Sequence, residues 1–239
     1  MIFALILAGG TGTRMGNIET PKQFLQLGDK PILIHTIEKF SLFEEFEKIL
    51  VLTPKNFTSH TEDLINKYIK NNDKIVVTTG ADLRNDTIIN GINFLKKNFS
   101  INDQDIVVTH DAVRPFVTYR IIKDNIECSK KYLSCDTVIS ATDTIVEGDG
   151  KKITSIPLRD NLYQGQTPQS FKINKFLELY NNLSLEDKNS LTDACKVFVL
   201  NNEDVYLIKG DETNIKITYP HDLQVANVIL NNKVLDNDK

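Results

Sequence analysis

The sequence lacks four features that would assign a chain of 239 residues to a specialised class. No apolar run approaches the roughly 18 residues of a membrane-spanning helix, and the opening MIFALILAGG lacks the basic segment and cleavage site of a signal peptide. The formal net charge of −4 leaves no basic excess for a nucleic acid polymer. The three cysteines form no CxxC pair, which is typical of a reducing compartment. We therefore expect a cytoplasmic protein without a membrane or nucleic acid partner.

What the chain does have is the composition of an ordinary globular protein, with 41% hydrophobic and 25% charged residues. A chain of this length can bury a full core. It contains no internal repeat and no low-complexity linker between its apolar segments. We therefore expect a single domain over residues 1–239.

Five short apolar runs predict the strands of a central sheet. They span residues 3–8, 48–54, 74–80, 105–112 and 137–146. Runs this continuous are typical of parallel strands that are buried on both faces, because helices then cover the sheet from each side.

Amphipathic segments between these runs predict helices over residues 59–70, 86–99 and 118–133. Ser59 and Glu62 have the spacing of a capping box at the start of the first helix. Strand and helix alternate four times. The pattern therefore predicts a doubly wound, mostly parallel α/β sheet of the Rossmann-like type.

The alternation ends after Thr137, and the next segment predicts two extended arms around the turn at 148–150. A hairpin of this kind is either a plain edge hairpin or a projecting arm that contacts a second subunit. We expect such a dimerisation arm at about residues 137–160. Two further strands at 205–210 and 214–218 precede a helix that begins at Pro220.

A glycine-rich loop, LAGGTGTRMG, follows the first predicted strand. Open α/β sheets bind ligands at the carboxyl ends of their strands, and Gly9, Gly10 and Gly12 allow backbone N–H groups to converge on an anion. The spacing is not that of a Walker loop, and Met15 stands where a dinucleotide fingerprint requires glycine. The loop is therefore either another kind of phosphate loop or a tight turn without a ligand.

Two cations follow the loop, Arg14 within it and Lys22 in the segment TPKQF. Burying unpaired cations is costly, so a structural role for both is a weaker explanation than a ligand. Cations at a phosphate loop can neutralise the charge that develops during a displacement at phosphorus. We expect both residues to be catalytic.

These motifs together resemble the sugar- and alditol-phosphate nucleotidyltransferases, in the branch that uses CTP. The resemblance rests on LAGGTGTRMG with PKQF, GADLRNDT, THDAVRPF, YQGQTPQSF, TDACKV and NIKIT, in that order along the chain. It implies CTP and a small alditol phosphate as ligands, a homodimer, and Mg²⁺ or another divalent cation as cofactor. The nucleotide contacts that it implies are Leu7, Ala8, Gly9, Gly10, Gly80, Ala81, Asp82, Arg84, Asn85, Asp86, Thr87 and Ala112.

The motif THDAVRP ends the fourth predicted strand, at the same sheet edge as the glycine loop. Mg²⁺ is commonly held by one or two carboxylates with substrate phosphates and waters, and the resemblance gives this role to Asp111. Arg114 is either an ion-pair partner that holds the loop or a substrate contact, and His110 is expected to orient a neighbour. Asp103 and Asp105 precede the strand, so we interpret their DxD spacing as a turn at the opposite edge.

The acceptor's phosphate is expected to bind Arg159 and Lys216, both catalytic by resemblance. Thr144 and Thr192 would be hydrogen-bonding neighbours among the substrate-binding residues, together with Arg114. In the family that the sequence resembles, the arm crosses to the other subunit, so the resemblance implies that Arg159, at the end of the predicted arm, acts across a dimer. GADLRNDT also has a simpler interpretation as a helix cap, with Asp86 or Thr87 as the capping residue.

The implied reaction is attack of an acceptor phosphate on the α-phosphorus of CTP with release of pyrophosphate. THDAVRPF, YQGQTPQSF and the absence of tryptophan resemble the ribitol-5-phosphate enzymes, which make CDP-ribitol for teichoic acid or capsule, more than the methylerythritol-phosphate enzymes. Two alternatives stay open: a nucleotide-binding regulator without activity and a glycosyltransferase. The second requires a metal-binding DxD after a strand.

Overall fold

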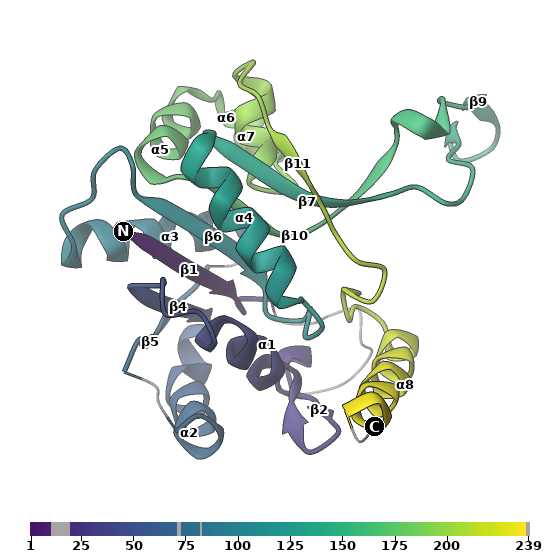
Figure 1. Cartoon of the computed structure of the whole chain (residues 1–239). Helices are drawn as coiled ribbons and strands as arrows, with labels where there is room; N and C mark the ends of the chain where they lie inside the picture. The colour runs from purple at the N-terminus through teal and green to yellow at the C-terminus, as the bar shows by residue number, and fades with distance from the viewer. Residues whose placement is uncertain (11–19, 71–72, 82, 238–239) are drawn as a thin grey trace.

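The structure is a computed structural model of the chain, and it describes residues 1–10, 20–70, 73–81 and 83–237, with side chains to residue 232 (Figure 1). A seven-stranded sheet forms its centre, in the order β11-β7-β10-β6-β1-β4-β5. The strands are β1 (Ile2–Leu7), β4 (Lys48–Thr53), β5 (Ile75–Thr79), β6 (Ile106–Asp111), β7 (Ser134–Ser140), β10 (Tyr163–Lys172) and β11 (Tyr206–Lys209). Only β10 runs antiparallel to its neighbours among these strands.

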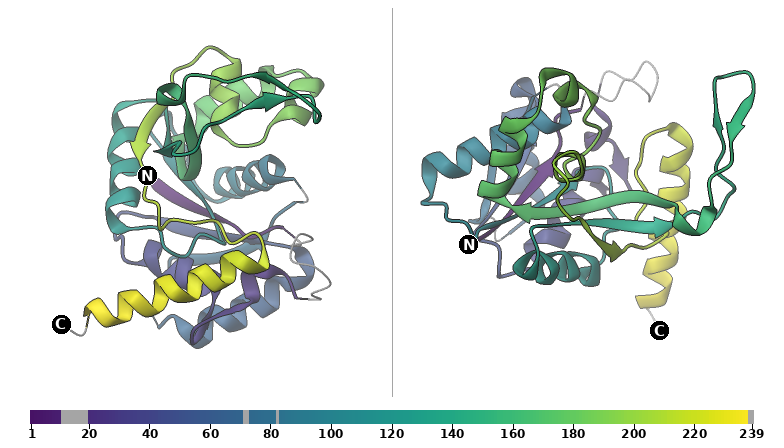
Figure 2. Two further views of the ribbon diagram at one scale, coloured as in Figure 1. Left: turned by 90° about the vertical axis from the view of Figure 1, so that its right-hand side faces the viewer. Right: turned by 90° about the horizontal axis from the view of Figure 1, so that it is seen from above.

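Helices cover both faces of the sheet (Figures 1 and 2). They are α1 (Ile32–Ser41), α2 (Thr58–Tyr68), α3 (Arg84–Asn98), α4 (Tyr119–Lys131), α5 (Ile173–Asn182), α6 (Leu185–Ser190), α7 (Cys195–Leu200) and α8 (Pro220–Asn237). Side chains of β1 alternate between two cores: Ala4 and Ile6 pack with α1, α2 and α4, whereas Phe3 and Leu5 pack with α3, α5 and α7. This alternation follows from the two-residue period of a strand and confirms the predicted doubly wound fold.

The first four predicted strands are confirmed to within two residues at each end, and β11 is confirmed as well. Two strand predictions are wrong in extent or kind. The run at 137–146 is a strand only to Ser140, and residues 214–218 form no ladder: the Ile217 N–H donates to the Val113 carbonyl at 2.9 Å as a single loop contact.

The helices at 84–98, 119–131 and 220–237 match their predictions, but the prediction of a capping box at the start of α2 is wrong. Helix α2 is preceded by a short 3₁₀ turn (Lys55–Phe57), and Phe57 holds the N-cap position without a side-chain cap. Ser59 is therefore already inside the helix, where its hydroxyl cannot serve as the cap.

The predicted hairpin is present as β8 (Glu147–Gly148) and β9 (Ile153–Ser155), a two-stranded sheet apart from the main one. It extends away from the body in Figure 1 and in the right-hand view of Figure 2. Its apolar side chains are open to solvent, with Ile156 at 61% and Leu158 at 67% exposure. The smaller pair β2 (Gln26–Leu27) and β3 (Lys30–Pro31) packs against α8. Within the described residues, no helix is long and apolar enough to cross a membrane.

Candidate active site

The site lies where the order of the sheet reverses. Strands β1 and β6 are neighbours, but the chain leaves β1 towards β4 and leaves β6 towards the other side of the sheet. Ligands of open α/β sheets bind outside such a point, at the carboxyl ends of the strands. A cavity of about 330 Å³ occupies this place. It is lined by Leu7, Ala8, Gly9, Gly10, Lys22, Gln23, Ala81, Leu83, Arg84, Thr87, Asp111, Ala112, Val113, Thr192 and Lys216.

The loop after β1 and the loop after β5 touch across the end of β4. A Cβ on Gly9 would lie 3.0 Å from the Ala81 carbonyl oxygen and 3.2 Å from the Thr87 hydroxyl. Contacts this short are tighter than most real Cβ contacts, so a side chain at Gly9 would require the two loops to move apart by a few tenths of an ångström. The two segments predicted to bind the nucleotide thus form one continuous wall.

Thr87 holds the second loop against helix α3. Its Oγ1 accepts a hydrogen bond from the Ala81 N–H at 2.9 Å and lies 3.0 Å from the carbonyl oxygens of Ala81 and Leu83. The N-cap of α3 is Leu83, without a side-chain cap, so neither Asp86 nor Thr87 is the N-cap. Asp82 lies outside the described residues.

Gln23, which the sequence did not single out, shapes the loop after β1. Its side chain is 2% exposed, and its Nε2 donates to the carbonyls of Ala8 at 2.7 Å and Gly10 at 3.1 Å. A glutamine beside Lys22 in PKQF gives no pattern that separates it from a surface residue. The signal lies in its burial, which only the fold reveals.

Asp111 is the electrostatic centre of the site. Its carboxylate lies 3.5 Å from Arg84 Nε, 3.6 Å from Arg114 Nε and 2.9 Å from Lys216 Nζ. Burial alone would raise the pKa of Asp111, but these three cations outweigh it and hold the pKa well below its usual range. One carboxylate against three cations leaves a net positive charge at this edge, which suits a polyphosphate.

Arg114 holds the loop after β6 in place. It is 8% exposed, and its Nη1 donates to the Asn214 carbonyl at 2.7 Å, while Nη2 lies 3.5 Å from the Gly165 carbonyl. It therefore ties β6, β10 and the segment before α8 together. The loop-holding interpretation of Arg114 is supported by these contacts, and its substrate contact stays a prediction.

His110 orients its neighbours, as predicted. The Asp111 N–H donates to Thr167 Oγ1 at 3.2 Å, the Thr167 hydroxyl lies 2.9 Å from His110 Nδ1, and His110 Nε2 lies 3.1 Å from the Arg114 carbonyl. Burial lowers the pKa of His110 to about 4, so the ring is neutral at pH 7 and donates from Nε2. Thr167 is a second residue that the sequence did not single out.

Not every predicted site residue comes to this cavity. Thr192 and Lys216 line it, but Thr144 and Arg159 are exposed on the arm, where Arg159 Nη1 donates to the Thr142 carbonyl at 3.3 Å. Asn85 is 6% exposed within the first turn of α3, and Asp86 lies 3.5 Å from the Tyr180 hydroxyl. Arg14 lies outside the described residues.

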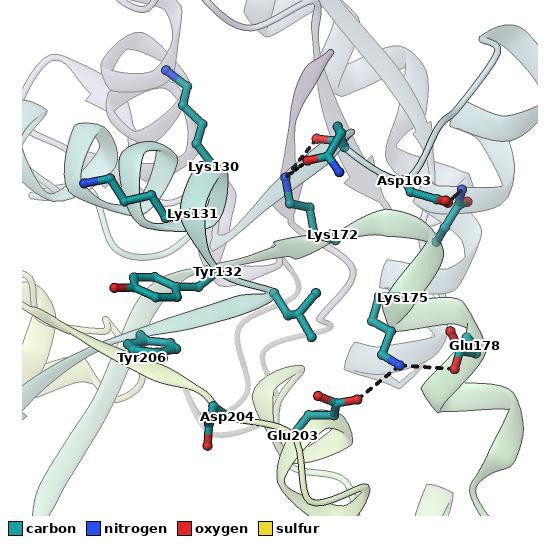
Figure 3. A pocket seen from close by; sticks show the side chains of 13 residues that line it. Asp103, Lys130, Lys131, Tyr132, Lys172, Lys175, Glu178, Glu203, Asp204 and Tyr206 are labelled. Carbon is teal, nitrogen blue, oxygen red and sulfur yellow. Dashed lines mark hydrogen bonds and ion pairs between the residues drawn. The ribbon is translucent and has the colours of Figure 1, made fainter.

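A second cavity, of about 590 Å³, lies at the opposite edge of the sheet, where β10 ends and β7 and β11 begin (Figure 3). Lys175 there is paired with both Glu178 at 3.2 Å and Glu203 at 3.1 Å. Tyr132 and Tyr206 stack with ring centroids 3.6 Å apart. None of the predicted site residues lines this cavity, and Asp103 is among those that do. The DxD pair therefore lies at the edge away from the site, as predicted.

Comparison with known proteins decides the family. Residues 2–232 match the model of the 2-C-methyl-D-erythritol 4-phosphate cytidylyltransferase (IspD) family. The chain belongs to this family. It is thus a nucleotidyltransferase by family, as the motifs predicted, and its sheet matches the fold of that family.

Individual relatives support the same assignment. A ribitol-5-phosphate cytidylyltransferase of Lactiplantibacillus plantarum is 54% identical over 230 residues, covering 96% of this chain and 98% of that protein. The crystal structure of 4-diphosphocytidyl-2C-methyl-D-erythritol synthase from Anaerococcus prevotii is 26% identical with a TM-score of 0.79, covering 96% of both chains. The 2-C-methyl-D-erythritol 4-phosphate cytidylyltransferase of Francisella tularensis is 26% identical with a TM-score of 0.76, covering 95% of this chain and 99% of that one.

Proposed function

We propose that this protein transfers CMP from CTP to D-ribitol 5-phosphate, giving CDP-ribitol and pyrophosphate. The observation that carries the proposal is the 54% identity, over 96% of the chain, to a relative named for ribitol 5-phosphate. The IspD-family structures, named for methylerythritol phosphate, are only 26% identical. A cytoplasmic enzyme that supplies a precursor for teichoic acid or capsule fits this reaction.

The cavity supports a displacement that needs no general base. A phosphate monoester has a second pKa of about 6, so the acceptor's oxygen is already an anion at neutral pH. It attacks the α-phosphorus of CTP in line, and the bond to pyrophosphate breaks. Lys22 and Lys216 both line the cavity, and we assign both, with Arg14, to neutralising charge at phosphorus.

The donor set at Asp111 fits a magnesium ion. Among the described residues, no group of three or more His, Cys, Asp and Glu side chains forms a metal site, and Asp111 is the one carboxylate of this part of the chain that lines the cavity. One carboxylate with substrate phosphates and waters is a common environment for Mg²⁺. Bound there, the ion would neutralise charge on the triphosphate. The chain's own part is to hold Asp111 ionised through the cations around it.

We also propose that the enzyme is a homodimer whose arm, at about residues 137–160, crosses to the partner within a single 239-residue domain. The arm leaves Ile153, Ile156 and Leu158 more than half exposed, and exposed apolar groups of this kind mark interaction surfaces. Arg159 stands on the same arm. In a dimer it would complete the acceptor site of the other subunit with Thr144.

The test is a pyrophosphate-release assay on purified protein with CTP and Mg²⁺. The acceptors are ribitol 5-phosphate and 2-C-methyl-D-erythritol 4-phosphate in parallel. Turnover with ribitol 5-phosphate, at a higher kcat/KM than with the other acceptor, is the expected result. A preference for methylerythritol phosphate would overturn the choice of substrate but not the reaction.

Release of pyrophosphate with neither acceptor would favour a nucleotide-binding regulator. Arg14→Ala and Lys22→Ala serve as internal controls, since each is expected to remove most turnover while the protein remains folded by circular dichroism. Near-wild-type rates for both variants would remove these cations from the mechanism.

A further inference from the structure

A smaller cavity, of about 190 Å³, adjoins the nucleotide cavity on the side of β10. The two cavities share Arg84, Asp111, Thr192 and Lys216 as lining residues. A ligand in the smaller cavity would therefore lie next to the phosphates of a nucleotide in the larger one. This is the position that an acceptor molecule must take for in-line attack.

Gly165 forms part of the wall of the smaller cavity, and the carboxylate of Asp136 lies behind it. A Cβ built on Gly165 would have Asp136 Oδ2 as its nearest neighbour, at 3.9 Å, with no other heavy atom within 4 Å. Gly165 thus places no side chain between the cavity and Asp136 Oδ2. Asp136 is on β7, opposite Gln169 of β10, and Gln169 also lines the cavity.

Three buried polar atoms at this place have no hydrogen-bond partner among the described residues. They are Asp136 Oδ1, an acceptor, and two donors, Arg84 Nη1 and Arg114 Nε, of which the second lies 3.6 Å from Asp111. Arg84 is close enough to lower the pKa of Asp136 by its charge. Buried polar atoms in proteins are normally paired, so an orphan donor and an orphan acceptor beside one cavity indicate a ligand group that can satisfy both. A hydroxyl group is the smallest organic group that both donates and accepts.

We propose that Asp136 accepts a hydrogen bond from a hydroxyl group of the polyol acceptor and so determines which acceptors are used. The inference rests on the proposed function and assigns its polyol-binding residue. Gly165, which has no side chain, gives access to the carboxylate of Asp136. Arg84 donates a hydrogen bond to the same polyol from the side of the nucleotide cavity.

The charges of the cavity set the orientation of the acceptor. Lys216 and Arg84 line both cavities, whereas Asp193 and the cation Arg114 line the smaller one alone, with Asp136 near Gly165. The carboxylates of Asp193 and Asp136 would repel an acceptor phosphate placed beside them, so we place the phosphate near Lys216 and the hydroxyl groups towards Asp136. Burial, reinforced by the charge of Asp193, raises the pKa of Asp136 to about 7. A hydroxyl donor at Oδ1 would stabilise the ionised form of the Asp136 carboxyl.

The test compares Asp136→Asn and Gly165→Ala with the wild type in steady-state assays. The acceptors are ribitol 5-phosphate and its mono-deoxy analogues, each lacking one hydroxyl group. Loss of a hydrogen bond to a charged group lowers kcat/KM by about 10- to 100-fold. We expect that loss for Asp136→Asn with ribitol 5-phosphate, an unchanged KM for CTP, and equal use of ribitol 5-phosphate and one of its deoxy analogues. Gly165→Ala keeps the carboxylate but places a methyl group before it, and should raise the KM for ribitol 5-phosphate alone.

Each outcome decides between the claims. A wild type that uses ribitol 5-phosphate, with Asp136→Asn equally active, overturns this inference and leaves the proposed function standing. A uniform fall with every acceptor, together with a lower melting temperature, would make Asp136 a structural residue and also overturn it. A wild type that does not use ribitol 5-phosphate overturns both.

Discussion

The two edges of the central sheet at which its strands begin and end carry the same kinds of residue, but the balance of positive and negative charge differs between them. At the edge of the site, Asp111 faces three cations. At the opposite edge, Lys175 faces two glutamates, and Lys130 is paired with Glu45 and Glu127. Both edges have a cavity, so a hollow with charged walls does not by itself identify a site. What differs between them is the excess of positive charge around Asp111, and we expect this difference to mark the site.

The largest expected effect comes from removing a lysine at each edge in turn. Lys216→Ala should lower kcat/KM by roughly 10²–10³, the usual cost of removing one fixed charge-stabilising group from a transition state. Lys175→Ala is the matched control, because it also removes a lysine paired with carboxylates beside a cavity. We expect its kinetics and melting temperature to equal the wild type. Similar losses for the two variants would show that the charge balance does not distinguish the edges.

Increasing the excess of positive charge at the site should cost stability. Asp111→Asn removes the counter-ion of the buried Arg114, and leaving a buried charge unpaired costs about 3 kcal/mol in the free energy of unfolding. The folded-state pKa of Asp111 is depressed, so its contribution is complete above the unfolded pKa and is lost only as the pH falls through the folded value. The stability difference between variant and wild type, from urea melts, should be constant from pH 8 to 5 and shrink only in stronger acid. A difference that already shrinks between pH 8 and 6 would contradict the ion-pair assignment.

Neutral groups at the same edge should have a smaller effect, on nucleotide affinity. Gln23→Leu removes the two hydrogen bonds to the carbonyls of Ala8 and Gly10. Since each such bond contributes about 1 kcal/mol, the loss of two should raise the KM for CTP by up to about 30-fold, with little change in kcat. Gln26→Leu makes the same exchange at an exposed position and should leave the KM unchanged. An unchanged KM in Gln23→Leu would mean that the loop keeps its shape without this side chain.

Most strands of the central sheet could be predicted from the sequence because buried parallel strands are continuous apolar runs. Strand β10 could not be predicted, although it lies in the middle of the sheet. Its sequence, YQGQTPQSFK, contains glycine and proline, which argue against a central strand. The structure accommodates both at a shift of register between Gly165 and Gln169. That irregular strand carries Thr167 and forms the wall before Asp136, so the part of the site that the sequence could not reveal depends on pairing between distant segments.

Arg159, on the arm, is a further cation that a dimer would add to those at the site. If Arg159 crosses a symmetric dimer to the site edge of the partner, a subunit with Arg159→Ala and a subunit with Lys22→Ala form one intact site between them. Each variant alone should be nearly inactive. Mixing them in equal amounts, with subunit exchange, gives half heterodimers with one intact site of two, so activity should recover to about a quarter of wild type. The double variant Lys22→Ala/Arg159→Ala mixed with an inactive partner carrying Lys22→Ala is the control, because no pairing then assembles a complete site. Exchange shown by mass-labelled subunits without recovered pyrophosphate release would mean that Arg159 acts within its own subunit, and that the cationic edge is complete in one chain.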